Sequence, residues 1–358
     1  DAPTFTEMAE ILASHFAGAD LAGYNILGYD IQLLTEEFAR ANRPFSLEGR
    51  RILDAQRIFH GRGGLHPGCE HWVLDAYPPV LVLTSFLPAD ADTDAQLATI
   101  GAALAQRWEI LAPGQPLNWV FQCRNEALRT QGRTETRLMA GSVPEPHVVT
   151  EQGARYRVHV LRGQNHGLFL DMAEGRRWVR EYAAARCDDR YGLKVLNLFA
   201  YTCAFSVVAL QAGAKSVVNV DMGHGAIATG QQNHQLNGLT AGASFLAHDI
   251  FSSWGKITRS GPYGLVIVDP PSYQKGSFVA TKDYARLLRR LPDLLAPGGH
   301  ALVCLNAPEL GVDFLHEHMQ AQAPELALVE RLANPPAFAD VDAQRALKVL
   351  VYRAPELP

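Results

Sequence analysis

The sequence GLVIVDPPSYQKGSF, residues 264–278, decides the fold that we expect for this chain. Its four successive apolar residues, Leu265–Val268, are typical of a strand buried on both faces, and Asp269 follows them directly. Pro270 and Pro271 then form a stiff turn, because a proline ring fixes one backbone angle and lacks the amide hydrogen. A DPP turn by itself can simply end a strand, so the neighbouring strands decide whether Asp269 has a function.

Short apolar runs alternate with helical patterns from residue 166 onward. The runs are KVLNLF (194–199), SVVNVD (216–221), SFLAHD (244–249), GLVIVD (264–269), HALVCLN (300–306) and ALKVLVYRA (346–354). Strands that are apolar on both faces and alternate with helices favour an α/β fold, with a doubly wound, Rossmann-like parallel sheet. In this architecture, ligands bind beyond the carboxyl ends of the strands.

Polar residues close five of these runs in succession. They are Asn197, Asp221, Asp249, Asp269 and Asn306. Because the carboxyl ends of parallel strands meet at one edge of a sheet, we expect these side chains to lie along one rim, where a ligand would contact them.

The loop after the first strand indicates the kind of ligand. It leads into a helix, whose free amides favour an anionic or carboxylate-bearing group. Asp221 is placed like the acidic residue that binds ribose hydroxyls in nucleotide-binding sheets, and the alternative is a helix N-cap. The loop is not G-x-G-x-x-G and no second glycine-rich turn could hold a diphosphate, which favours an adenosyl ligand without a diphosphate over NAD.

Five motifs then occur in one order along the chain. They are GLFLDMAEGRRW (167–178), NLFAYT (197–202), VDM (220–222), HDIF (248–251) and DPPSY (269–273). Through them the segment from about 147 to 358 resembles the class I S-adenosylmethionine-dependent methyltransferases. It resembles specifically the large-subunit ribosomal RNA methyltransferase family, whose members make 5-methylcytosine or 7-methylguanine.

The resemblance implies a role for each matching position. The residues implied to bind S-adenosylmethionine are Phe169, Asp171, Arg176, Asn197, Phe199, Tyr201, Thr202, Asp221, Met222, Asp249 and Ile250. The residues implied to face the methyl group and the target base are Asp269, Pro270, Pro271, Tyr273 and Asn306. Methyl transfer is an in-line displacement at a sulfonium carbon, so the protein mainly positions a nucleophile and excludes water.

Two departures from the family pattern bear on this expectation. Cys203 and Ala204 stand where the family usually carries glycines, which is expected to narrow the approach of the cofactor to the backbone. Asn306 stands where cytosine-methylating members carry the cysteine that attacks the ring, whereas guanine-methylating relatives carry asparagine there. We therefore expect a guanine nitrogen as the target, and Cys304, inside the preceding strand, as a buried residue rather than a substitute nucleophile.

The expected domains are 1–60, 61–165 and 166–358. The first resembles the middle of a DEDD-type 3'-5' exonuclease through Asn25, Tyr29 and Asp30. Such nucleases hold two metal ions with four carboxylates, so a truncated, inactive segment is expected. The second reads as a small α+β domain on the substrate side.

Composition and charge limit the kinds of protein and partner that are expected. The chain has 358 residues, of which 47% are hydrophobic, a formal net charge of -5 and five cysteines. The cysteines and histidines are not spaced as a disulfide framework or a metal site, and neither a secretory signal nor a membrane-spanning run is present, so a cytoplasmic protein is expected. The mildly acidic balance predicts no strong nonspecific binding to nucleic acid, and RLLRRL (286–291) is expected to be a solvated helix face, with an RNA-phosphate role as the alternative.

The expected function is methylation of a ribosomal RNA base. The alternatives are a small-molecule or protein substrate, a cofactor-free protein that binds RNA or a partner, and a metal-dependent nuclease.

Overall fold

The structure is a computed structural model that divides into two compact units. It describes residues 54–88, 91–125, 128, 134–163, 165–187, 192–271, 273–274 and 278–356. Of these, the first unit holds 54–62, 66–153 and 158–166, and the second holds 63–65, 154–157 and 167–356. The exonuclease-like motif of Asn25, Tyr29 and Asp30 lies outside the described residues.

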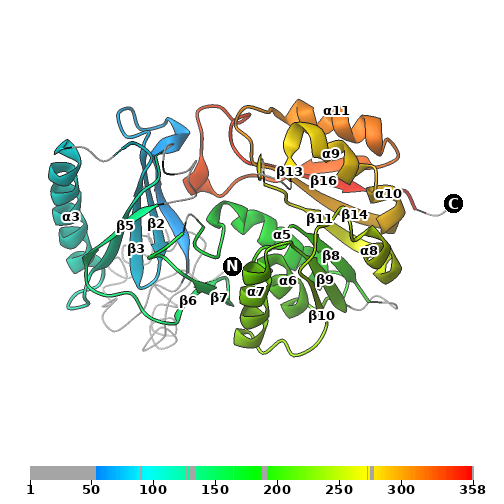
Figure 1. Cartoon of the computed structure of the whole chain (residues 1–358), viewed down its shortest axis with the longest axis horizontal. Coiled ribbons are helices and arrows are strands. Elements are labelled where there is room, and N and C mark those ends of the chain that lie inside the picture. The colour runs from blue at the N-terminus through cyan, green and yellow to red at the C-terminus, as the bar shows by residue number, and fades with distance from the viewer. Residues whose placement is uncertain are drawn as a thin grey trace, which may run out of the picture. The chain divides into compact units, whose positions relative to one another are not determined.

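The first unit is built on a five-stranded sheet in the order β1-β2-β3-β4-β5 (Figure 1). The strands are β1 (Gln56–His60), β2 (Trp72–Tyr77), β3 (Val80–Ser85), β4 (Asn118–Cys123) and β5 (Glu135–Ala140). Only β3 and β4 pair in parallel, and α3 (Ala91–Leu111) makes the crossover that this pairing requires. Residues 56–60, expected in the N-terminal segment, thus form an edge strand of this sheet, next to β2.

The second unit is built on a seven-stranded sheet in the order β10-β9-β8-β11-β14-β16-β15. The strands are β8 (Lys194–Leu198), β9 (Ser216–Val220), β10 (Ala243–Leu246), β11 (Tyr263–Val268), β14 (Leu295–Leu305), β15 (Ala327–Arg331) and β16 (Lys348–Arg353). The five strands from β10 to β14 are parallel, and β16 runs antiparallel to both of its neighbours. The expected doubly wound, Rossmann-like sheet is confirmed.

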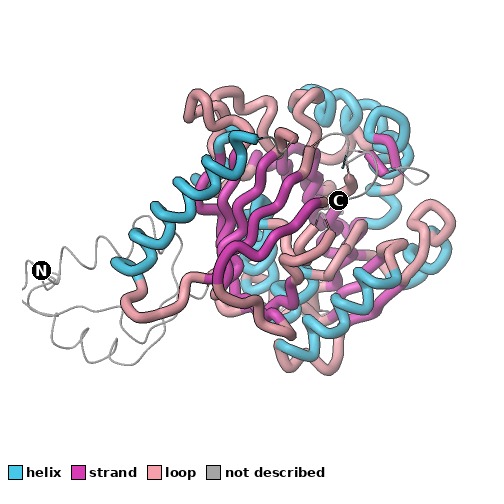
Figure 2. The backbone as a smooth tube through the Cα atoms, turned by 60° about the vertical axis from the view of Figure 1, so that its left-hand side comes forward, coloured by secondary structure: helices cyan, strands magenta, loops and turns pink. Residues whose placement is uncertain are grey.

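Helices and short elements precede or connect these strands (Figure 2). They are η3 (Leu170–Met172), α5 (Ala173–Ala184), α6 (Ala204–Gln211), α7 (His224–Leu236), α8 (Trp254–Ser260), β12 (Tyr273–Gln274), β13 (Phe278–Val279), α9 (Ala280–Leu288), α10 (Leu291–Leu294), α11 (Val312–Gln322) and η4 (Pro336–Phe338). The remaining elements are η2 (Gly61–Gly63), β6 (His147–Glu151) and β7 (Ala154–Val158). Among the described helices, none is long and apolar enough to cross a membrane.

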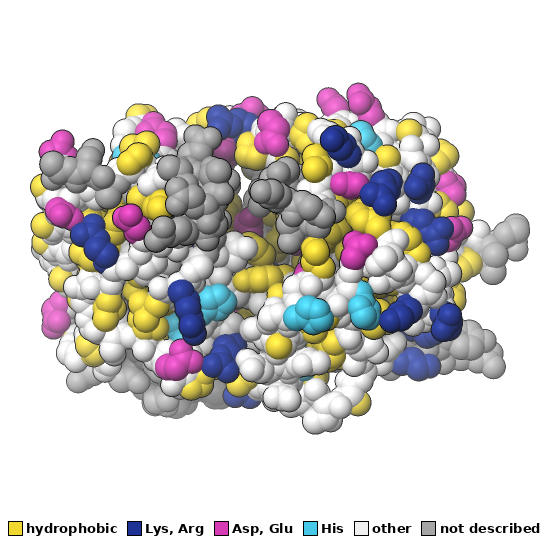
Figure 3. Space-filling model, in the orientation of Figure 1, with side chains coloured by type: hydrophobic (Ala, Val, Ile, Leu, Met, Phe, Trp, Pro, Cys, Tyr) yellow, Lys and Arg dark blue, Asp and Glu magenta, His cyan; other side chains and the backbone are white. Residues whose placement is uncertain are grey.

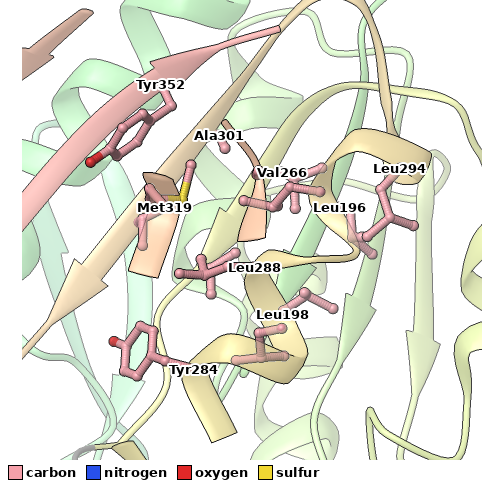
Figure 4. Close-up of a cluster of buried hydrophobic side chains, with 14 of the residues drawn as sticks. Leu196, Leu198, Val266, Tyr284, Leu288, Leu294, Ala301, Met319 and Tyr352 are labelled. Carbon is pink, nitrogen blue, oxygen red and sulfur yellow. The ribbon is translucent and has the colours of Figure 1, made fainter. Parts of the chain in front are cut away.

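One face of the large sheet packs against α8, α9, α10 and α11. Leu196, Val266 and Ala301 lie side by side across β8, β11 and β14, and Leu288 and Met319 pack over them from the helices (Figure 4). The apolar positions of α9 are three and four residues apart, so burial of one helix stripe fixes its orientation.

The opposite face carries a buried polar network that changes one expectation. Asn197 does not close its strand, because β8 continues through Leu198, and its side-chain amide donates to Asn219 of β9 at 2.9 Å. Asn219 donates in turn to the Ser206 hydroxyl on α6, and Ser206 is paired with His234 on α7 at 2.8 Å. Asn197 therefore joins the sheet to its helices instead of standing at the rim.

The loop between β8 and α6 has an unusual backbone. Phe199, Tyr201 and Cys203 all adopt positive φ angles, of 56°, 48° and 61°, which side chains other than glycine rarely tolerate. Thr202 secures the loop, because its hydroxyl donates to the Gly167 carbonyl at 2.6 Å and its own carbonyl accepts from Asn233.

The Cys203 side chain lies against α7. It is fully buried, and a Cβ added at Gly230 of α7 would lie 2.5 Å from its sulfur. The resembling family usually carries a glycine where this chain has Cys203. The space for the larger cysteine side chain is provided by Gly230, which has no side chain.

We predict that Gly230→Ala lowers the free energy of unfolding by about 1–3 kcal/mol, because the new methyl group overpacks against Cys203. Gly225→Ala on the same helix is the matched control. Nothing lies within 4 Å of its added Cβ, so this substitution should not lower the free energy of unfolding. Urea unfolding of both variants measures the difference. Equal stabilities would show that the fit between Cys203 and Gly230 is not tight.

Candidate active site at the carboxyl edge of the sheet

A charged cluster surrounds Asp269 at the end of β11, within the second unit. Arg176 is almost completely buried on α5, and its guanidinium donates to the Phe169 carbonyl at 2.7 Å. Asn306, which directly follows β14, donates to the Asp171 carboxylate at 3.4 Å. The structure thus brings together four residues from three separate segments of the chain, since Asp171 and Arg176 belong to one motif.

The surroundings of Asp269 control its charge. Burial raises the pKa of Asp269 to about 7, and the neighbouring Asp171 carboxylate also raises it. The Arg176 guanidinium and a hydrogen bond from the Cys304 thiol act in the opposite direction. Asp269 can therefore exist as an acid or as a carboxylate near neutral pH, which is typical of residues in active sites.

Cys304 is completely buried in β14. Burial raises the pKa of its thiol well above the usual range, and the Asp269 and Asp171 carboxylates reinforce this. A nucleophilic cysteine needs a depressed pKa, because the thiolate is the reactive form. The environment of Cys304 thus agrees with the expectation that it is not a nucleophile.

Asp221 stands directly after β9 and organises two turns. One of its carboxylate oxygens accepts from the Tyr201 amide at 2.9 Å and the other from the Gly223 amide at 2.7 Å. The first bond holds the positive-φ loop after β8, and the second shapes the turn into α7. A carboxylate oxygen can accept more than one hydrogen bond, so Asp221 retains acceptor capacity for a ligand hydroxyl.

Apolar side chains flank this carboxylate. Phe169 and Met222 are 41% and 45% exposed, which is uncommon for large hydrophobic groups. The Phe169 ring packs against Tyr201 at 5.1 Å between centroids, and burial raises the pKa of Tyr201 to about 12. Phe199 on the same loop packs edge-on against Phe278.

Asp249 does not close its strand as expected, because β10 ends at Leu246 and two further residues precede Asp249. Asp249 is exposed and caps the following turn, accepting from the Ser252 amide at 3.0 Å. Ile250 is only 4% exposed and belongs to the core beneath the sheet. Of the DPPSY motif, Pro270 is buried and Pro271 half-buried, whereas the Tyr273 side chain lies outside the described part of the structure.

Lys348 supports the site although no motif marked it. Its ammonium group is fully buried in β16 and donates to the carbonyls of Ala307, Leu310 and Gln344 at 2.7–2.8 Å. Two of these carbonyls belong to the loop that directly follows Asn306. The available signal was a lysine inside the apolar run LKVLVY, since lysine is almost never fully buried without partners.

The polar and apolar groups at this edge fit S-adenosylmethionine as a ligand. Asp221 offers an acceptor to ribose hydroxyls, and the exposed Met222 side chain beside it offers an apolar surface to a base. The loop after β8 lines the same edge, because Tyr201 is bonded directly to Asp221. S-adenosylmethionine would thus be held by residues 199–202, Asp221, Met222 and Asp249.

Comparison with known proteins agrees with this geometry. The chain is 30% identical over 234 residues to ribosomal RNA large subunit methyltransferase I of Aeromonas salmonicida, which covers 63% of this chain and 55% of that protein. It is 37% identical over 186 residues to ribosomal RNA large subunit methyltransferase K/L of a Psychrobacter species, covering 50% of this chain and 21% of that one. The chain therefore spans about half or less of the length of these relatives.

A solved structure and a family model complete the comparison. The structure of SMU.776, a candidate methyltransferase complexed with SAH, superposes with a TM-score of 0.71 at 23% identity, over 90% of this chain and 79% of that one. This likeness concerns the fold alone. The model of the S-adenosylmethionine-dependent methyltransferases matches residues 56–353. The chain belongs to the S-adenosylmethionine-dependent methyltransferase family.

Proposed function

We propose that this protein methylates a guanine nitrogen in large-subunit ribosomal RNA. The observation that carries the proposal is the group of Asp269, Asp171 and Asn306 at the carboxyl edge, beside a Cys304 thiol that stays protonated. The names of the curated relatives supply the RNA class. The first unit would help to hold the RNA.

S-adenosylmethionine supplies an electrophilic methyl group on a sulfonium. The protein residues position the base that receives it. Asp269 in its carboxylate form accepts a hydrogen bond from a ring N–H or amino group of the base, and the rigid Pro270–Pro271 turn limits the movement of that acceptor. A ring nitrogen carries its own lone pair, so no covalent attack by the protein is needed.

Asn306 distinguishes the two target atoms known in the resembling family. Its amide is turned toward Asp171 and offers no nucleophile, and the thiol that contacts Asp269 is that of the buried Cys304. A cytosine C5 target would require a thiolate, which burial of Cys304 opposes. Both features favour guanine over cytosine.

The first test is transfer of labelled methyl from S-adenosylmethionine to unmodified large-subunit ribosomal RNA, followed by nucleoside analysis. We expect the label in a methylguanosine, and Cys304→Ser should retain this activity. Label in 5-methylcytosine that disappears in Cys304→Ser would overturn the choice of target. Binding of the cofactor without transfer to RNA would overturn the RNA assignment.

Substitutions of Asp269 and Asp221 should affect different properties, the rate of methyl transfer and the affinity for the cofactor. We expect Asp269→Ala to reduce transfer by at least about 100-fold, as for loss of a group that acts in the transition state, with nearly unchanged cofactor affinity. Asp221→Ala should weaken cofactor binding first. Calorimetric binding and single-turnover rates measure the two properties, and parallel losses in both variants would refute this division.

The raised pKa of Asp269 predicts a pH-dependent stability. The folded protein holds this proton up to about pH 7, whereas an ordinary aspartate has a pKa of 3.8, so the stabilising contribution is complete below about pH 4 and is lost as the pH rises through 7. Asp269→Asn should therefore become more stable relative to the wild type over that window. Urea unfolding at several pH values measures the difference; a constant offset would contradict the assignment.

A further inference from the structure

Helices α8 and α9 and the turn between α9 and α10 carry a basic surface that the proposed site does not use. It consists of Lys256, Arg259, Lys282, Arg286, Arg289 and Arg290, referred to below as the basic face. Lys and Arg side chains gather over these helices in Figure 3, although the whole chain has a net charge of -5. The positive charge is therefore concentrated locally against an acidic background.

The basic face is continuous across two elements. Lys282, Arg286 and Arg289 lie on one side of α9, opposite the buried stripe that contains Leu287 and Leu288. Arg286 stacks over the Phe251 ring at 4.0 Å. This contact joins α9 to the segment that leads into α8.

Arg290 makes the second link. Its guanidinium lies 5.4 Å from the centroid of the Trp254 ring and bonds the Thr258 hydroxyl on α8. Stacking on aromatic rings holds both arginines in place, which reduces the entropy that they would lose on binding a ligand.

Charge compensation on this surface is incomplete. Arg286 pairs with Asp283 at 2.9 Å and Arg290 with Asp293 at 3.3 Å. The ion pairs between described residues include none for Lys256, Arg259, Lys282 or Arg289. The surface thus keeps a net positive charge that suits a polyanion.

The position and chemistry of the basic face indicate which polyanion. Phe251, under Arg286, stands two residues after Asp249 of the candidate site, so the face begins next to that site. None of the large hydrophobic side chains exposed in the described residues lies on α8, α9 or α10. Membrane insertion and protein docking both favour exposed apolar groups, whereas contacts with phosphates require charge alone.

We propose that the basic face binds the sugar-phosphate backbone of the RNA strand that carries the target base. The inference rests on the proposed function and adds to it a second contact region, outside the methyl-transfer site. Contacts with phosphates position a strand without reading its sequence. The basic face would therefore contribute affinity and orientation, while the residues around Asp269 select the base.

The test compares two triple variants that each remove three positive charges. The first, Arg259→Gln with Lys282→Gln and Arg289→Gln, changes the basic face. The control, Arg107→Gln with Arg155→Gln and Arg345→Gln, changes exposed arginines elsewhere in the chain. Binding of an unmodified large-subunit ribosomal RNA transcript is measured by fluorescence anisotropy at several salt concentrations, together with S-adenosylmethionine affinity and the KM for RNA.

We expect the first variant to bind RNA at least about tenfold more weakly than the wild type. The slope of log K against log salt concentration should become shallower by about 2, since each of the three lost single-strand phosphate contacts contributes roughly 0.7. KM should rise while cofactor affinity stays unchanged, and the control should match the wild type. Equal losses in both variants would mean that net charge alone matters, and unchanged binding in the first would reject the basic face.

Two further outcomes separate the inference from the proposed function. If the wild type methylates RNA and the first variant does so with the same KM, only the inference fails. If the wild type neither binds nor methylates RNA, the proposed function fails and the inference with it. Binding of the wild type to phosphatidylglycerol vesicles that the first variant loses, without any effect on RNA, would assign the face to a membrane surface instead.

Discussion

The parallel pairing of β8 with β9 on one side and β11 on the other is the constraint on which the site depends. In this register Leu198 lies beside both Val220 and Val268. The residues that follow these three, on three distant segments, therefore emerge at one edge of the sheet. Phe199, Asp221 and Asp269 meet there because the backbone hydrogen bonds leave no other alignment with both faces of the strands buried.

The loop after β8 has a strained backbone that contacts with other parts of the fold stabilise. Three residues with side chains adopt left-handed backbone angles within five positions, and each costs of order 1 kcal/mol or more. Asp221 accepts one loop amide, Asn233 donates to one loop carbonyl, and Gly230 makes room for Cys203. These contacts determine the shape of the loop, and so they also determine where a cofactor could lie.

Buried polar groups in the second unit serve to fix positions. Arg176 and Lys348 are both almost or fully inaccessible, and a buried cation is costly unless hydrogen bonds surround it. Arg176 bonds the Phe169 carbonyl and lies near Asp269, whereas Lys348 bonds three carbonyls around the loop after Asn306. The two cations hold the segments on either side of the Asp171–Asn306 contact.

The sequence by itself determined the class of fold, the order of the strand-end motifs and the resemblance to methyltransferases, because strand period, apolar runs and motif spacing are local properties. It did not determine the direction of individual side chains. Asn197 matched a motif yet points into a network with Asn219, and Lys348 matched none yet supports the loop after Asn306. The pKa of Asp269 depends on Asp171, Arg176 and Cys304, whose distance in the chain says nothing about their distance in space. Only the tertiary structure decided these features, since burial and electrostatic contact arise from packing between segments that are remote in the sequence.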